Sequence, residues 1–96
     1  MILETAEFTV TDGPAFESAV REALPLFHGS RGCQGVTLHR VIEDPSRYRL
    51  LVRWATLEDH TETFRASQAF ARWRALVTPH LAQPPSVTHS GAVLDA

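Results

Sequence analysis

The 96-residue chain contains a single cysteine, Cys33, and no lysine. One cysteine excludes a disulfide within the chain, so the fold does not depend on an oxidising compartment. The surrounding stretch Arg31–Gly35 offers at most one positive charge to activate the thiol, so we expect Cys33 to be a small apolar residue that leads into a strand. All nine positive charges are arginines, whose planar and permanently charged groups suit anionic or phenolate ligands.

Long apolar runs are also absent. No segment approaches the roughly 20 apolar residues that cross a bilayer, and the N-terminus lacks the charged and then apolar order of a signal peptide. The formal charge is −2 and no basic run occurs, which excludes the electrostatic pattern of a nucleic-acid binder. We therefore expect a cytoplasmic protein that binds neither membranes nor nucleic acid.

The composition that remains is typical of one folded domain that spans the whole chain, with 44% hydrophobic and 21% charged residues. Ile2–Val10 alternates apolar and polar residues as a strand does, except that Glu4 falls on the apolar side. Asp12 as a cap and a proline in the first turn then predict an amphipathic helix over Pro14–Leu26.

Two further strands are predicted at Gly35–Ile42 and Tyr48–Ala55, because apolar residues alternate in both. The link between them, Glu43–Arg47, is short and rich in turn formers, so the two strands are expected to be antiparallel neighbours. Gln83–Pro85 forces an extended linker, after which Ser86–Leu94 is predicted as the last strand.

The stretch Trp54–Leu81 contains two helical pieces and both tryptophans. Thr56 and Asp59 have the spacing of a capping box, and Ser67 is a good cap for the second piece. The apolar stripe that faces inward is predicted to consist of Leu57, His60, Thr61, Phe64, Phe70, Trp73, Val77 and His80.

The element order is β-α-β-β-α-β with the second helix in two parts. This order predicts an α+β, ferredoxin-like fold with a four-stranded antiparallel sheet. Two helices cover only one face of such a sheet, and the other face carries Leu3, Val41 and Leu51. We therefore expect a homodimer in which two copies of the chain meet sheet to sheet.

Histidines are the strongest candidates for chemistry. His60 lies on the inward stripe one turn before Phe64, and His89 lies in the last strand near Gly91, which leaves room beside it. A structural role stays open for both: His60 as a half-buried histidine bonded to a backbone carbonyl, and His89 beside a glycine that permits tight helix packing. His39 has the opposite parity in its strand and is predicted to face the dimer interior. Since no HxxxH or HxH pair occurs, we predict no metal site, although convergence of the three histidines stays open.

Aromatic and arginine side chains near the stripe are candidates for substrate contacts. These candidates are Phe8, Arg53, Phe64, Phe70, Trp73 and Arg74. The aromatic members have a spacing that serves a core as well as a pocket. The two arginines are placed to reach the edge of a ligand or to pair with Glu58 or Glu62, whereas Arg65 and Arg72 are expected in solvent.

Three features together resemble the antibiotic biosynthesis monooxygenase family. They are Trp54 at a strand end, the run LEDHTETFRASQAFARWRAL, and the closing stretch Pro84–His89. The resemblance extends to Ala6-Glu7 and to Gly32–Gly35, and so covers essentially the whole chain. It implies a dimeric α+β barrel with a pocket between the sheet and the helices of each subunit.

Some members of this family oxidise an electron-rich polyphenol or hydroquinone with dioxygen and without a metal or flavin. The resemblance therefore implies a monooxygenase that needs no cofactor and acts on a small aromatic substrate, an aromatic polyketide or a quinol. His60 or His89 would take the phenolic proton, and an arginine or the other histidine would hold the anion. Two alternatives stay open: a polyketide cyclase or isomerase on the same fold, and a non-catalytic dimer that binds a small molecule.

The heme-degrading branch of the family uses a strand asparagine, a helix tryptophan and a heme-ligating helix histidine. This sequence has Phe8, Phe64 and Arg74 at the aligned positions. Because all three differ, heme breakdown is not expected.

Overall fold

The computed structural model describes residues 1–96 as four strands and a set of helical segments. In chain order these are β1 (Ile2–Thr9), α1 (Gly13–His28), β2 (Cys33–Arg40), β3 (Arg47–Trp54), a π-helical segment (Asp59–Phe64), α2 (Gln68–Val77), a 3₁₀ turn (Thr78–His80) and β4 (Ser86–Ser90). The strands form one antiparallel sheet in the order β2-β3-β1-β4. This arrangement confirms the predicted ferredoxin-like α+β fold, with an open sheet in the single chain.

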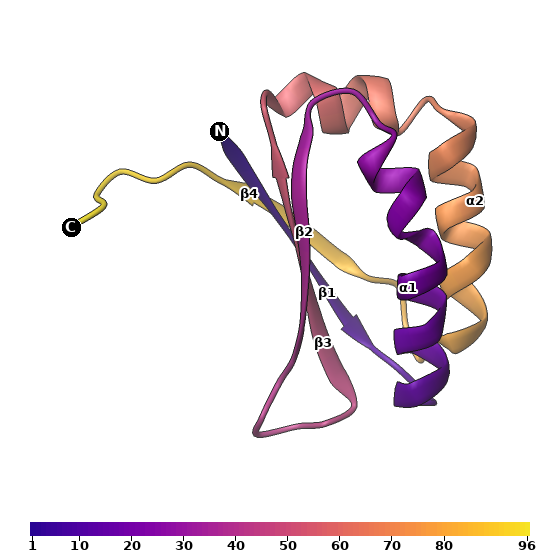
Figure 1. The fold of residues 1–96 in the computed structure, drawn as a ribbon. Helices are drawn as coiled ribbons and strands as arrows, with labels where there is room; N and C mark the ends of the chain where they lie inside the picture. Colours follow the sequence, from indigo (N-terminus) through magenta and orange to yellow (C-terminus); the bar gives the residue numbers. More distant parts are fainter.

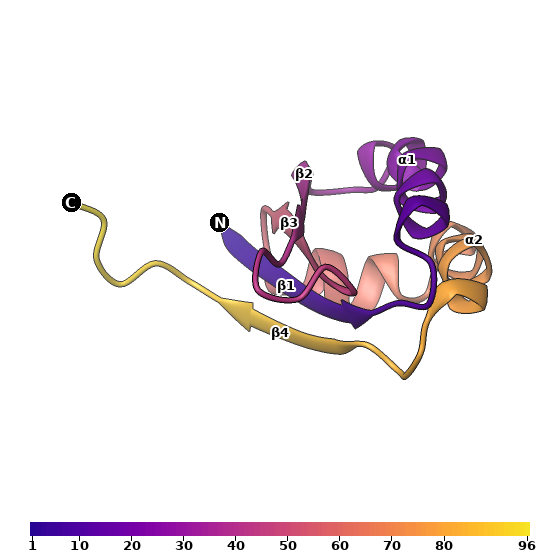
Figure 2. The same cartoon turned by 90° about the horizontal axis from the view of Figure 1, so that it is seen from below.

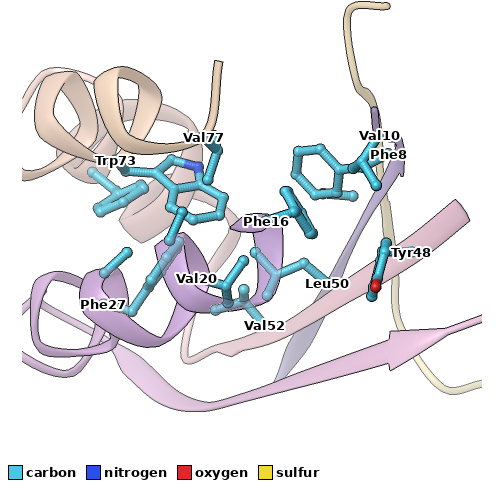
Figure 3. Packing of buried hydrophobic residues seen from close by; sticks show 14 of the residues in the cluster. Phe8, Val10, Phe16, Val20, Phe27, Tyr48, Leu50, Val52, Trp73 and Val77 are labelled. Carbon is cyan, nitrogen blue, oxygen red and sulfur yellow. The ribbon is translucent and has the colours of Figure 1, made fainter. Parts of the chain in front are cut away.

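All helical segments lie on one face of the sheet, as Figures 1 and 2 show from two directions. The core between the two layers is rich in aromatic rings, several of which are labelled in Figure 3. Phe27 of α1 meets Trp73 of α2 edge to face at 4.9 Å between ring centroids. Phe16 lies 5.1 Å from Phe8 on β1. These contacts fix α1 and α2 side by side over the central strands.

The first helix begins as predicted and ends later. Asp12 caps it by accepting a hydrogen bond from the backbone N–H of Ala15 at 3.0 Å. The prediction ended the helix at Leu26, but it continues to His28. The two additional residues are held in the helix because Phe27 is 1% exposed and its ring belongs to the core. Pro25 lies in the last turn of the helix and, because it has no N–H, donates no hydrogen bond there.

Two strand boundaries differ from the prediction. β2 begins two residues early, at Cys33, because a bulge between Cys33 and Gly35 lets it pair with the end of β3. β4 ends at Ser90 rather than at Leu94. Ser90 is opposite Leu3, near the start of β1, so the residues beyond it have no strand to pair with. The C-terminal residues therefore project away from the body of the molecule (Figures 1 and 2).

The second helix is split, as predicted, and Ser67 caps its second part by accepting from the N–H of Phe70 at 3.2 Å. The first part is a π-helix, in which the N–H of Arg65 donates to the carbonyl of His60, five residues earlier. This winding turns Asp59, His60 and Phe64 inward. Leu57, expected on the inward stripe, is instead 39% exposed, because the α-helical spacing that defines the stripe does not hold through the π-helical segment.

Half of the expected capping box is present. Thr56 accepts a hydrogen bond from the N–H of Asp59 at 3.2 Å. The Asp59 side chain makes no reciprocal hydrogen bond to the backbone N–H of Thr56. Its carboxylate lies 3.7 Å from Nε of Arg31 and against Gly32. None of the helices is both long and apolar enough to cross a membrane.

Gly32 joins α1 to the sheet in a conformation that other residues adopt only with strain. Its φ is +79°, and its carbonyl accepts a hydrogen bond from the N–H of Ala55 at 2.8 Å. A Cβ atom at this position would lie 2.0 Å from Oδ2 of Asp59, which itself begins the π-helix. The turn at Gly32 thus sets how closely the π-helical segment approaches the sheet.

Replacing Gly32 by alanine is expected to lower the free energy of unfolding by about 1–3 kcal/mol, through the positive φ and the clash with Asp59. Gly91→Ala is the matched control, because a Cβ there meets nothing within 4 Å. Urea unfolding of both variants measures the difference. Equal stability of the two variants would contradict this account of the turn.

Candidate active site

A cleft of about 540 Å³ opens between the sheet, α2 and the segment that leads into β4. Its lining is Glu4, Ala6, Phe8, His60, Phe64, Arg65, Phe70, Trp73, Arg74, Val77, Thr78, Leu81, Ala82, Gln83, Pro84, Pro85 and Val87. Strands β1 and β4 supply one wall, and the two helical pieces supply the other. The volume lies in the range of sites for small organic molecules, and most walls are aromatic or aliphatic.

One end of this cleft holds a buried polar cluster. Glu4 lies on β1 at 5% exposure, among residues that otherwise form the core. The indole N–H of Trp54, at the end of β3, donates to Glu4 Oε1 at 2.9 Å. His60 Nε2 lies 3.3 Å from the same oxygen. A carboxylate that is buried beside an aromatic cleft, with partners for its oxygen, is a frequent arrangement in sites that move protons.

His60 and His89 lie side by side in this cluster. Nδ1 of His60 and Nε2 of His89 are 2.7 Å apart, a hydrogen-bond distance. The pairing of β4 with β1 places His89 opposite Glu4, and the π-helix turns His60 toward both. His60 also stacks on Trp54, with 5.3 Å between ring centroids and 21° between the planes. The imidazole of His60 is therefore held on two sides.

Burial and charge shift the proton affinities of the cluster. The pKa of His60 falls to about 4, first because burial disfavours the imidazolium and then because of the positive charges of Arg65 and His89. Burial and Arg65 also lower the pKa of His89. Burial raises the pKa of Glu4, although the hydrogen bond from Trp54 and the charge of Arg65 act in the opposite direction. At neutral pH both imidazoles are thus uncharged and able to accept a proton.

The structure gathers most of the predicted substrate contacts around the cleft. Those that line it are Phe8, Phe64, Phe70, Trp73 and Arg74. The guanidinium carbon of Arg74 lies 5.8 Å from the centroid of Phe70, and Arg74 forms no ion pair with Glu58 or Glu62. His60 lines the cleft as well, whereas His89 is not among the lining residues and contacts His60 behind the wall.

Two other candidate residues lie on the open face of the sheet: Arg53, against the prediction that it contacts substrate, and His39, as its parity predicted. Arg53 is not among the residues of the cleft; its guanidinium lies beside Gly35, its partner on β2. In β3, Arg53 alternates with the buried residues that face the helices, so it belongs to the open face of the sheet. His39 also falls on this face, where it is exposed and opposite Arg49. His39, His60 and His89 therefore do not converge, and no group of three potential ligands lies close enough to hold a metal ion.

Two residues of the site were missed. Glu4 left a signal in the sequence, because it was the one charged residue on the apolar side of a strand. Arg65 was expected in solvent, and although exposed it lines the cleft and influences all three titratable groups of the cluster. No local pattern marks Arg65, because its position depends on the π-helical winding that precedes it.

The open-faced ferredoxin-like sheet and its aromatic cleft define a class of small α+β proteins, and comparison with known sequences identifies the family. Residues 1–76 match the family described as antibiotic biosynthesis monooxygenase. The chain belongs to this family, as the resemblance predicted.

Particular relatives support this assignment over nearly the whole chain. A structure from Bordetella bronchiseptica, assigned to the same family, is 46% identical with a TM-score of 0.94 and covers 97% of each chain. The uncharacterized protein YczJ of Bacillus subtilis (strain 168) is 38% identical over 91 residues, which are 93% of this chain and 96% of YczJ. SnoaB of Streptomyces nogalater, a cofactor-independent oxygenase, shares the fold at 17% identity and a TM-score of 0.86, with 98% of this chain and 94% of SnoaB covered.

The ring signals of His60 in an NMR titration are expected to move with a midpoint near pH 4, against about 6.5 for the chain unfolded in urea. Because the folded-state pKa is the lower one, neutral His60 contributes stability that is present above pH 6.5 and is lost as pH falls toward 4. A midpoint at or above 6.5 would show instead that a charged Glu4 holds His60 as imidazolium.

Proposed function

We propose that the protein is a cofactor-independent monooxygenase that oxidises an aromatic polyketide or quinol-type substrate with dioxygen. The observation that supports this most is the Glu4–His60–His89 cluster at one end of an aromatic cleft. Membership of the monooxygenase family supports the reaction type, and SnoaB provides a cofactor-independent oxygenase with the same fold.

The reaction requires a base, a dry site and a partner for a developing anion. Removal of a phenolic or benzylic proton leaves an electron-rich anion, which gives an electron to dioxygen; the resulting radical pair combines to a peroxide. Loss of water then completes the balance, in which a methylene group and dioxygen become a carbonyl group and water. The Glu4 carboxylate and the neutral imidazole of His60 beside it can take the proton in the first step, and Arg65 and Arg74, which line the cleft and form no ion pair, suit the anion.

Oxygen uptake by the purified, metal-stripped protein with anthrones and hydroquinones tests this proposal. We expect uptake above the buffer control and incorporation of one atom of labelled dioxygen into the product. His60→Gln is expected to lower kcat by about 100-fold, because a positioned acid or base contributes about 10²–10⁴-fold. Thr88→Ala, on the open face of β4, is the control and should retain activity.

Uptake no faster than buffer across a broad panel of polyphenols would contradict the oxygenase. Turnover of the same substrates under argon would indicate a cyclase or isomerase that uses the same base. Binding without turnover in either atmosphere would favour a non-catalytic binding protein.

We also propose that the protein acts as a homodimer through the open face of its sheet. Helices cover the other face only (Figure 2), and Leu3 and Leu51 lie half-buried on the open face of the two central strands, β1 and β3. Val93 and Leu94 of the projecting C-terminal segment are 100% and 85% exposed. A second copy of the chain would cover both apolar surfaces.

Sedimentation equilibrium at micromolar concentration is expected to give twice the mass of the chain. Leu51→Asp should shift the protein to a monomer, because it places a charge at the centre of the proposed interface. Ala75→Asp, exposed on α2, is the control and should remain dimeric. A wild-type monomer would overturn this part of the proposal.

A further inference from the structure

The contact between His60 and His89 limits how many protons the pair holds. The 2.7 Å between His60 Nδ1 and His89 Nε2 leaves room for one hydrogen atom between the two nitrogens. If both nitrogens carried hydrogen, two N–H groups would point at each other. As long as the contact exists, a proton that arrives at one imidazole must therefore displace the shared proton toward the other.

The two imidazoles also differ in where they lie. His60 is 3% exposed and lines the cleft beside Glu4. His89 is half-buried on β4, an edge strand that pairs with β1 alone, and it is not among the residues that line the cleft. Glu4, His60 and His89 thus form a row that begins at the wall of the cleft and ends at the edge of the sheet.

We propose that Glu4, His60 and His89 form a proton path between the cleft and the solvent at the edge of β4, in which His89 is the outer, positioning residue rather than the base that meets substrate. This inference rests on the proposed oxygenase function for its use in turnover, but the path itself is a property of the protein without substrate.

The transfers balance in both directions. In the tautomer that carries a proton on Nδ1 of both rings, a proton that the substrate gives to the Glu4 carboxylate passes to the free Nε2 of His60. The Nδ1 proton of His60 then moves to Nε2 of His89, and the Nδ1 proton of His89 leaves to solvent. Each ring ends in its other neutral tautomer. The reverse sequence returns a proton to the cleft. Oxidation with dioxygen needs proton transfer in both directions along the path. The substrate first loses a proton, and the peroxide later takes up a proton so that its outer oxygen leaves as water.

The groups around the path favour a mobile proton over a fixed ion pair. Arg65 faces the cluster from the end of the π-helix, and its positive charge disfavours a resident imidazolium. Trp54 on β3 donates to Glu4, which stabilises the carboxylate. Cys33 on β2 is held as a thiol, because burial raises its pKa. Asp59 is turned toward Arg31.

The path is tested without substrate by ¹⁵N NMR of the histidine rings. We expect a scalar coupling between His60 Nδ1 and His89 Nε2 across the shared hydrogen, and uptake of one proton by the pair as pH is lowered. His89→Asn should abolish the coupling and leave the fold intact, as seen in the amide spectrum. Independent titration of the two rings, without coupling in the wild-type protein, would overturn the proposal.

Chemical rescue tests the path during turnover. His89→Ala is expected to lower kcat at least 10-fold with little change in KM, and added imidazole should restore kcat by occupying the space that the side chain leaves. His89→Phe fills that space and should not respond to imidazole. Unchanged kcat in His89→Ala, or a loss that imidazole does not restore, would contradict the path. If no substrate consumes oxygen, the proposed oxygenase fails, while the NMR result still decides the path.

Discussion

The burial of one carboxylate governs the organisation of this molecule. Glu4 sits on a central strand whose other residues of the same parity, Ile2, Ala6 and Phe8, are apolar, and its oxygen accepts a hydrogen bond from the indole N–H of Trp54. An unpartnered carboxylate in this place would cost several kcal/mol, of the order that mutational data assign to buried polar groups. The end of β3, the inward turn of His60 and the register of β4 all converge on this group.

The scaffold and the site depend on each other at this point. Aromatic contacts hold α1 and α2 against the sheet, and they leave an apolar cleft between α2 and β1. The polar cluster closes one end of that cleft, where burial keeps two imidazoles uncharged. A site that combines aromatic walls with uncharged bases is suited to a flat, weakly acidic molecule more than to a metal or a phosphate.

The sequence predicted the fold well because alternation, caps and turn formers are local signals. The element order, the split of the second helix and the capping role of Ser67 were all visible in the spacing of residues. The site was only partly predictable. His60 and His89 were named separately, but their contact arises from the pairing of β4 with β1. In the sequence, Glu4 stood out only as a charged residue on the apolar side of a strand. Arg53 was predicted to contact substrate, although its parity in the strand placed it on the other face of the sheet.

The π-helical segment has a consequence for how this site can be gained or lost along a lineage. A π-helix fits more residues into each turn than an α-helix, so one deletion between Asp59 and Phe64 would let the segment relax to α-helical winding. The residues before the deletion would then rotate by roughly 100° relative to those after it. His60 would leave the cleft without being mutated. In this scaffold, the length of one short segment decides the presence of the histidine pair as much as the identity of its residues.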